Sequence, residues 1–488
     1  MSNIKQETLS GAKWVMINKC VMQPANFLYF MVLARLITPA EMGVLGLTGI
    51  FFAVANTLKE AGFGMALIRK QDRTEVDCCT VFWFNIVANI LVGLIFWFVA
   101  PWFAVFFNVP DLKWITRISS IMMVLGATQS VHYTLYTAKR DFKTPTIIGI
   151  CTTLLGMPVT LYLAYAGWSY WSMVISGAFT GLVGLIVIWI VSPWKPRWLF
   201  SWKSFREFFF FGFKLSLTGC IWQAYANCVQ FLIGRVYSPA QLALYDRGKH
   251  LASLPGTMIF EPINGIMYPI LATLQDDESR LLSVYRKLLR MSVMSMSWIL
   301  LTLVASAESL IHLFYGPTWI PCAEYLQVIC LGTIFSPLIR VNLSYLMVKG
   351  RTDLIMNREI AVVVVNLLFI ACSVSISVMA VCWAIAIATV CNFVITILMS
   401  IRVSGLSFFT QMSDFTPYCV VALAANVPAF LIGYYGIPYY ICSFVGPALS
   451  LVLYLVFLHL RKDDAYFMLR DTVWNSSPVK KMRAFFSV

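Results

Sequence analysis

The sequence predicts an all-α integral membrane protein with about 14 transmembrane helices. Of its 488 residues, 60% are hydrophobic and 12% are charged, whereas a soluble chain carries about 25% charged residues. Apolar segments long enough to cross a bilayer recur along the chain, and the loops between them divide their cations unevenly. The net charge of +14 therefore indicates basic loops on one side of a membrane, and we expect no nucleic-acid partner.

Each apolar segment of about 20 residues is expected to form one membrane-spanning helix. The fourteen segments are residues 11–36, 42–66, 80–106, 114–137, 145–166, 171–192, 208–235, 241–272, 288–314, 323–347, 359–376, 380–401, 415–434 and 439–460. No charged residue divides the stretch from 359 to 401, so a count of 12 to 14 spans fits the sequence.

The distribution of Lys and Arg residues predicts the orientation. Most of them lie in one set of loops, which includes the N-terminal segment, residues 67–79, residues 193–207 and the tail after Leu460. The opposite set of loops and adjoining helix ends holds only Arg35, Lys113, Arg117 and Arg235. Because basic loops stay in the cytoplasm, both termini are predicted to be cytoplasmic, in the cell inner membrane.

The chain also repeats itself at an offset of about 200 residues. The matching segments are Gly11-Ala12-Lys13 with Gly212-Phe213-Lys214, Ala25-Asn26 with Ala226-Asn227, and residues 35–40 with residues 235–240. Six predicted helices separate the two copies, so both copies run in the same direction. This predicts two parallel lobes with a cavity between them.

Polar side chains at helical spacing mark the predicted walls of that cavity, because such groups are costly in hydrocarbon. The longest stripe, in the span 241–272, is Asp246, His250, Ser253, Thr257, Glu261 and Asn264. The candidate substrate-binding residues are Lys19, Gln23, Asn26, Arg35, Lys214, Gln223, Asn227, Gln230, Arg247, Lys249 and Arg340. The candidate proton-coupling or gate residues are Asp246, His250 and Glu261. Helix–helix packing is the alternative for such polar residues, and Asp246 could instead pair with Arg247 or Lys249 as a structural lock.

Several kinds of function are disfavoured by what the sequence lacks. There is no phosphate-binding Gly-x-x-x-x-Gly-Lys-Ser/Thr motif. Every predicted outer loop is short, and no pair of carboxylates lies in one of them. The 13 Cys and four His residues have no metal-ligand spacing. We therefore expect no enzyme activity, no cofactor, no metal and no cleaved signal peptide.

Short motifs resemble those of a known family. They are Ser10-Gly11-Ala12-Lys13-Trp14, Leu33-Ala34-Arg35, Ala61-Gly62-Phe63-Gly64, Ile68-Arg69, residues 108–112, Gln275-Asp276-Asp277, and Phe314-Tyr315-Gly316 with Trp319. The order and spacing of these motifs resemble those of the polysaccharide transporter branch of the multidrug/oligosaccharidyl-lipid/polysaccharide exporter superfamily. The resemblance extends to about residue 350. The pattern is most similar to Wzx-type flippases of lipid-linked oligosaccharides.

The resemblance implies two six-helix lobes and two extra C-terminal helices. The expected division is an N-terminal lobe at 1–192, an interfacial linker at 193–207, a C-terminal lobe at 208–401, extra helices at 402–460 and a basic tail at 461–488. It also implies alternating access for an undecaprenyl-diphosphate-linked oligosaccharide, with membrane lipids and glycan polymerase machinery as partners. A drug or cation antiporter of the same superfamily and a membrane glycan polymerase are the alternatives.

Overall fold

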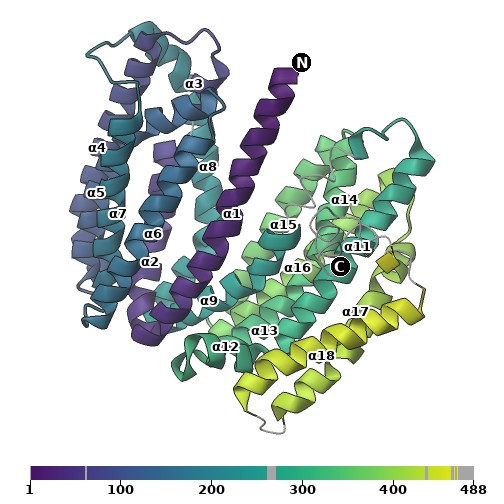
Figure 1. Ribbon diagram of the computed structural model, residues 1–488. Coiled ribbons are helices and arrows are strands. Elements are labelled where there is room, and N and C mark those ends of the chain that lie inside the picture. The colour runs from purple at the N-terminus through teal and green to yellow at the C-terminus, as the bar shows by residue number, and fades with distance from the viewer. Residues whose placement is uncertain are drawn as a thin grey trace, which may run out of the picture. The chain divides into compact units, whose positions relative to one another are not determined.

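The computed structural model describes residues 2–60, 63–260, 271–434, 438–462, 466–467 and 470. Within these residues the regular secondary structure is entirely helical (Figure 1), which confirms the all-α prediction. Nine helices in this part of the chain are long and apolar enough to cross a membrane. The count of fourteen spans stays a prediction. The chain forms two compact units, Met1–Ala243 and Leu244–Val488.

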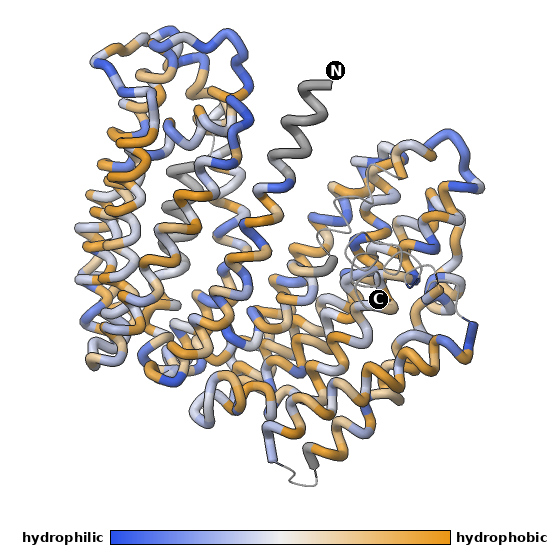
Figure 2. The backbone as a smooth tube through the Cα atoms, viewed as in Figure 1, coloured by the Kyte–Doolittle hydropathy of each residue, from blue (hydrophilic) through white to orange (hydrophobic). Residues whose placement is uncertain are grey.

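The first unit is a bundle of long helices. Its elements are α1 (Ser2–Leu36), α2 (Pro39–Glu60), α3 (Phe63–Arg69), α4 (Glu75–Phe106), α5 (Leu112–Ala138), α6 (Lys143–Tyr165), α7 (Trp171–Val191), α8 (Trp202–Val236) and the first turn of α9 (Pro239–Pro255). Helix α4 packs along α5, α6 packs along α7, and α2 packs against both α5 and α8. Figure 2 shows hydrophilic residues gathered in the connecting segments of this unit, which fits helices whose ends meet water.

The second unit continues from α9 into a π-helical turn, η1 (Gly256–Phe260). Its other elements are α11 (Glu278–Ala305), α12 (Ala307–Tyr315), the 3₁₀ turn η2 (Pro317–Trp319), α13 (Cys322–Thr333), α14 (Ser336–Val348), α15 (Thr352–Ser373), α16 (Val378–Ser404), α17 (Phe408–Tyr434) and α18 (Tyr439–Leu460). The apolar stretch from 359 to 401 is thus two helices. The expected span 323–347 consists of α13 and α14, which together form one candidate span, Cys322–Val348. Helices α17 and α18 lie side by side, and α17 packs along α11.

The sequence repeat is present in the structure as a repeated turn. Helix α1 ends at Leu36 and α2 begins at Pro39, and 200 residues later α8 ends at Val236 and α9 begins at Pro239. Each turn carries a helix cap. The Glu41 amide donates to Thr38 Oγ1 (3.4 Å), and the Gln241 amide donates to Ser238 Oγ (3.3 Å). Proline at the first helical position and a hydroxyl cap before it both favour helix initiation.

The segment that joins α7 to α8 is docked on α4. Trp83 stacks on Trp198 with ring centroids 4.0 Å apart, and Trp83 Nε1 donates to the Arg197 carbonyl (2.9 Å). The Ser201 amide donates to Thr80 Oγ1 (3.0 Å). The outer face of Trp198 remains exposed, which fits the interfacial position expected for residues 193–207. The domain boundaries drawn around this segment stay a prediction, as does the tail after Leu460, most of which lies outside the described residues.

Candidate functional site

A pocket of about 270 Å³ lies inside the second unit, where α9 and η1 meet α13, α14 and α16. Its lining residues are Tyr245, Lys249, Ala252, Ser253, Gly256, Thr257, Ile329, Thr333, Ser336, Arg340 and Ile385. The pocket therefore joins two of the predicted substrate-binding residues, Lys249 and Arg340, although 91 positions separate them in the sequence.

Close packing brings three of the helices around this pocket together. A Cβ atom at Gly248 would lie 3.1 Å from the Leu326 amide nitrogen, and one at Gly332 would lie 2.7 Å from Ala386 Cα. These glycines let α9 approach α13 and let α13 approach α16. The π-helical turn after Pro255 then keeps Thr257 on the pocket wall. Turns of this kind are frequent at functional sites.

The lining is cationic and rich in hydroxyl groups. Arg340 is exposed, and the half-buried Lys249 has its ammonium nitrogen 5.9 Å from the centre of the Tyr245 ring. The four hydroxyl groups are those of Ser253, Thr257, Thr333 and Ser336. Among the described residues that line this pocket, none is acidic. Such a set suits an anion, because Lys and Arg donate charge-assisted hydrogen bonds and hydroxyl groups can rotate to donate.

The rest of the α9 stripe has other surroundings. Arg247 is hydrogen-bonded to Tyr315 and interacts electrostatically with Asp246, which also acts on Lys249. His250 is exposed, and its carbonyl accepts a hydrogen bond from Ser253 Oγ (2.7 Å). Glu261, the third candidate for proton coupling, lies outside the described residues.

The remaining predicted residues belong to α1 and α8 of the first unit. Lys19, Asn26, Arg35 and Lys214 are exposed, whereas Gln23, Gln223, Asn227 and Gln230 are half-buried. Asn227 Nδ2 donates to the Gln223 carbonyl (2.8 Å), so part of that polar face is bonded within α8.

A buried ion-pair cluster in the second unit lies outside the set of predicted residues. Arg286 donates two hydrogen bonds to Asp414 (2.8 and 2.9 Å), and Arg290 donates a third (2.7 Å). The spacing of the two arginines, four residues apart on one helix, could have indicated a shared acceptor. Their partner lies more than 120 residues away, so the sequence alone did not identify it.

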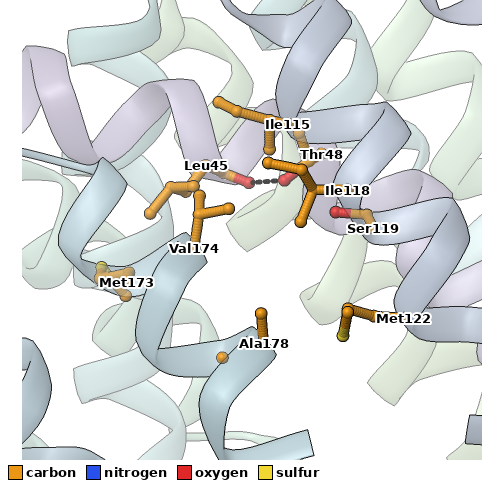
Figure 3. A pocket seen from close by; sticks show the side chains of 10 residues that line it. Leu45, Thr48, Ile115, Ile118, Ser119, Met122, Met173, Val174 and Ala178 are labelled. Atoms are coloured by element: carbon orange, nitrogen blue, oxygen red, sulfur yellow. Dashed lines mark hydrogen bonds between the residues drawn. The ribbon is translucent and has the colours of Figure 1, made fainter. Parts of the chain in front are cut away.

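A second pocket, of about 340 Å³, lies inside the first unit between α2, α5 and α7 (Figure 3). Its lining residues are Leu45, Thr48, Ile115, Ile118, Ser119, Met122, Met173, Val174, Gly177 and Ala178. The Thr48 hydroxyl donates to the Leu45 carbonyl (2.7 Å), so that polar group is bonded to its own helix. This pocket is therefore largely apolar, in contrast to the cationic pocket of the second unit.

Residues 32–324 match the model of a family described as polysaccharide biosynthesis protein. The chain belongs to this polysaccharide biosynthesis protein family. The match covers α2 to η2 in full, so it includes all the lining residues of the apolar pocket and those that α9 and η1 contribute to the cationic pocket. Together with the apolar helices, membership of the family identifies a multi-pass membrane protein.

Two relatives of this family member cover most of its length. The teichuronic acid biosynthesis protein TuaB of Bacillus subtilis (strain 168) is 26% identical over 399 residues, which are 81% of this chain and 82% of TuaB. The lipopolysaccharide biosynthesis protein WzxC of Escherichia coli (strain K12) is 23% identical over 362 residues, 72% of each chain.

The fold is that of a solved flippase structure. An inward closed conformation of the lipid II flippase MurJ aligns with a TM-score of 0.73 and 12% identity, covering 92% of this chain and 99% of MurJ. This likeness establishes the fold. The family match and the relatives confirm the resemblance to polysaccharide transporters that the short sequence motifs indicated.

Proposed function

We propose that the chain is a flippase that moves undecaprenyl-diphosphate-linked oligosaccharide repeat units from the cytoplasmic to the periplasmic leaflet of the inner membrane. The product would feed the assembly of exopolysaccharide, capsule or O-antigen, with a glycan polymerase as the next partner. The family, the relatives named for polysaccharide biosynthesis and the MurJ fold all support transport of a lipid-linked saccharide.

The observation that carries the proposal is the cationic pocket of the second unit. A diphosphate bears negative charge, and the interaction between opposite charges is strong where water is scarce. Lys249 and Arg340 supply the cations, and the surrounding hydroxyl groups can bond phosphate or sugar oxygens. We assign the diphosphate to this pocket.

The same pocket argues against a transporter of cationic drugs. Such a site would need carboxylates to offset the charge of its ligand, whereas the described residues that line this pocket include two cations and no acid. An antiporter of the same superfamily therefore remains the weaker alternative, and raised resistance to several unrelated cationic drugs on expression would favour it.

Transport by alternating access also needs a polar path for the saccharide. We propose that Lys19, Asn26 and Lys214, which are exposed on α1 and α8, line that path. A charged side chain facing hydrocarbon is costly, so an exposed lysine in a spanning helix is more stable beside water. Gln23, Arg35, Gln223, Asn227 and Gln230 complete the proposed wall.

Coupling to the proton gradient is a further part of the proposal, with Asp246, His250 and Glu261 as candidates. Arg247 is bonded to Tyr315 and lies close to Asp246, which makes this pair a candidate for the structural lock. If Glu261 carries the proton, Glu261→Gln should abolish transport driven by the gradient and leave substrate binding nearly intact. Unchanged transport in Glu261→Gln would remove it from both roles.

The proposal is tested with purified protein in liposomes and a fluorescent undecaprenyl-diphosphate oligosaccharide. The wild type should move the lipid between leaflets. Lys249→Gln and Arg340→Gln should each weaken binding about tenfold or more, the effect of losing a charged hydrogen bond of about 1.5–3 kcal/mol.

Lys287→Gln is the matched control, because Lys287 is an exposed cation on α11 outside the pocket. It should flip lipid at the wild-type rate. If well-folded wild-type protein moves no lipid-linked oligosaccharide, the proposed function is wrong. If both pocket variants behave like Lys287→Gln, the diphosphate binds elsewhere.

A further inference from the structure

The apolar pocket of the first unit lies at a defined depth along its three helices. The deepest of its described lining residues, Thr48, Met122 and Ala178, follow the starts of α2, α5 and α7 by 7 to 10 residues. At about 1.5 Å per residue, the pocket ends within about 15 Å of those helix starts. All three helices start at the predicted periplasmic side. The pocket thus occupies the outer half of a hydrocarbon core about 30 Å thick.

The described residues of the lining offer no charged group to bind a headgroup. Branched side chains of Leu45, Ile115, Ile118 and Val174 form much of the wall, and Met122 and Met173 lie on opposite sides (Figure 3). Thioether side chains adapt to irregular shapes. A hydrocarbon is the chemical class that fits.

The volume supports occupancy by part of a chain. Ligand pockets in proteins measure about 300–1,000 Å³, and apolar cavities of about 150 Å³ already exclude water and bind small hydrocarbons. At about 340 Å³, this pocket can hold a segment of a long lipid. Moving hydrocarbon from lipid to protein gains no hydrophobic free energy, because lipid tails are equally apolar. The binding free energy must therefore come from dispersion contacts between the lipid chain and the pocket wall, which are absent when the pocket is empty.

We propose that this pocket binds a segment of the polyprenyl chain of the lipid-linked substrate, in the outer half of the membrane. The assignment rests on the proposed function, which supplies a methyl-branched polyprenyl lipid as cargo. A methyl-branched chain presents more atoms per unit length to an irregular, branched wall than a linear acyl chain does. The pocket thereby favours the cargo over the surrounding phospholipids.

Gly177 allows the pocket to be filled without a clash. A Cβ atom added at Gly177 meets no heavy atom within 4 Å, and the same is true at Gly181, one turn further along α7 and outside the lining. Gly177→Phe should therefore occupy the pocket, and Gly181→Phe is a control of the same size on the same helix. Ala178→Leu provides a second, smaller filling of the pocket.

The test is photo-crosslinking in liposomes, with full-length protein and peptide mapping by mass spectrometry. One probe is undecaprenyl phosphate with a diazirine on its chain, and the other is phosphatidylglycerol with a diazirine on an acyl chain. The polyprenyl probe should label peptides that contain Met122 or Met173 at least about tenfold more than the phospholipid probe at equal mole fraction. Unlabelled undecaprenyl phosphate should compete. Labelling should be lost in Gly177→Phe, reduced in Ala178→Leu and kept in Gly181→Phe.

Equal labelling by both probes, or labelling that survives Gly177→Phe, would overturn the proposal. So would preferential labelling by phosphatidylglycerol, which would make the pocket a site for bilayer lipid. Labelling does not require transport. The experiment can therefore disprove the polyprenyl site without disproving the flippase activity, and the reverse. Flipping by wild-type protein without labelling here removes only the polyprenyl site, whereas labelling without flipping of the oligosaccharide removes only the flippase.

Discussion

Single glycines set the distance between helices in this protein. At Gly43, in the first turns of α2, an added Cβ atom would lie 1.8 Å from the Pro239 carbonyl oxygen. The carbonyl belongs to backbone and cannot rotate away as a side chain could. Pro239 begins α9 at the second repeated turn, and Gly43 lies four residues after Pro39, which begins α2 at the first, so the close approach joins one copy of the repeat to the other within the first unit.

Gly43→Ala should therefore destabilise the first unit, by about 1–3 kcal/mol as for other overpacked sites. Thermal unfolding in detergent measures the change. Gly49→Ala is the control on the same helix, because its Cβ would meet nothing within 4 Å. An alanine there should leave the melting temperature unchanged or raise it slightly, since Ala favours helix over Gly by up to about 1 kcal/mol. Equal melting temperatures for the two variants would contradict this account.

At the scale of elements, polar contacts link the starts of α2, α5 and α7 at the predicted periplasmic end of the first unit. Ser169 Oγ donates to Glu41 Oε1 (2.5 Å), and the Thr38 amide and hydroxyl both donate to Glu41 Oε2 (2.8 Å each). Tyr170 is hydrogen-bonded to Asp111. Burial, followed by this bond, raises the pKa of Tyr170 to about 12, so its hydroxyl stays a donor at ordinary pH.

These contacts predict a pH dependence. Burial opposes the ionisation of Glu41, but the hydrogen bonds from Ser169 and Thr38 outweigh it, and the pKa of Glu41 lies below its ordinary value. In the unfolded chain the pKa of a Glu is about 4.3. The stabilisation is thus complete above that pH and is lost as the pH falls through the lower pKa of the folded state.

The measurement compares the melting temperature of the wild type with that of Glu41→Gln between pH 7 and the acid limit of the protein. The difference between the two should shrink only below about pH 4.3. Ser169→Ala should raise the pKa of Glu41 and move this loss to higher pH. A difference that does not vary with pH would show that the charge of Glu41 contributes nothing.

The C-terminal helix pair depends on one buried carboxylate. The Asp414 side chain of α17 is 3% exposed and binds Arg286 and Arg290 of α11, which are each 35% exposed. Asp414→Asn should destabilise the docking of α17 by about 1–3 kcal/mol, between the values for exposed and fully buried pairs. A lower melting temperature and faster proteolysis between α16 and α17 would show that this docking is weaker.

Asp353→Asn is the matched control for this cluster. Asp353 pairs with Arg351 at the surface of the same unit, with side chains 57% and 45% exposed. Breaking an exposed ion pair should leave the melting temperature and the rate of proteolysis at the wild-type level. If Asp414→Asn is as stable as Asp353→Asn, the cluster does not hold the helix pair.

For the whole molecule, the charge distribution predicts that both termini are cytoplasmic. A reporter that is active only in the cytoplasm should therefore be active when fused after Val488. A periplasmic reporter inserted at Ile376, between α15 and α16, should also be active, because the turn there separates two spans. Periplasmic activity of a fusion at Val488 would refute the orientation, and cytoplasmic activity at Ile376 would reduce the number of spans.

The sequence by itself determined the class of fold, the family resemblance and the repeat, because these depend on local patterns. Hydropathy predicts which segments span the membrane. Thr38-Pro39 and Ser238-Pro239 set where the second helix of each copy starts. Lys249 and Arg340 were also identified as candidates from the cost of charge in a membrane. Their roles in transport stay predictions.

Only the tertiary structure decided which of these groups meet. It put Lys249 and Arg340 into one pocket and bonded Arg247 to Tyr315, although Arg247 is only two residues from Lys249. It also brought Asp414 to Arg286 and Arg290 and left an apolar void between α2, α5 and α7. The physical reason is that local sequence sets helices and their polar faces, whereas packing between distant helices decides which faces touch and which enclose space.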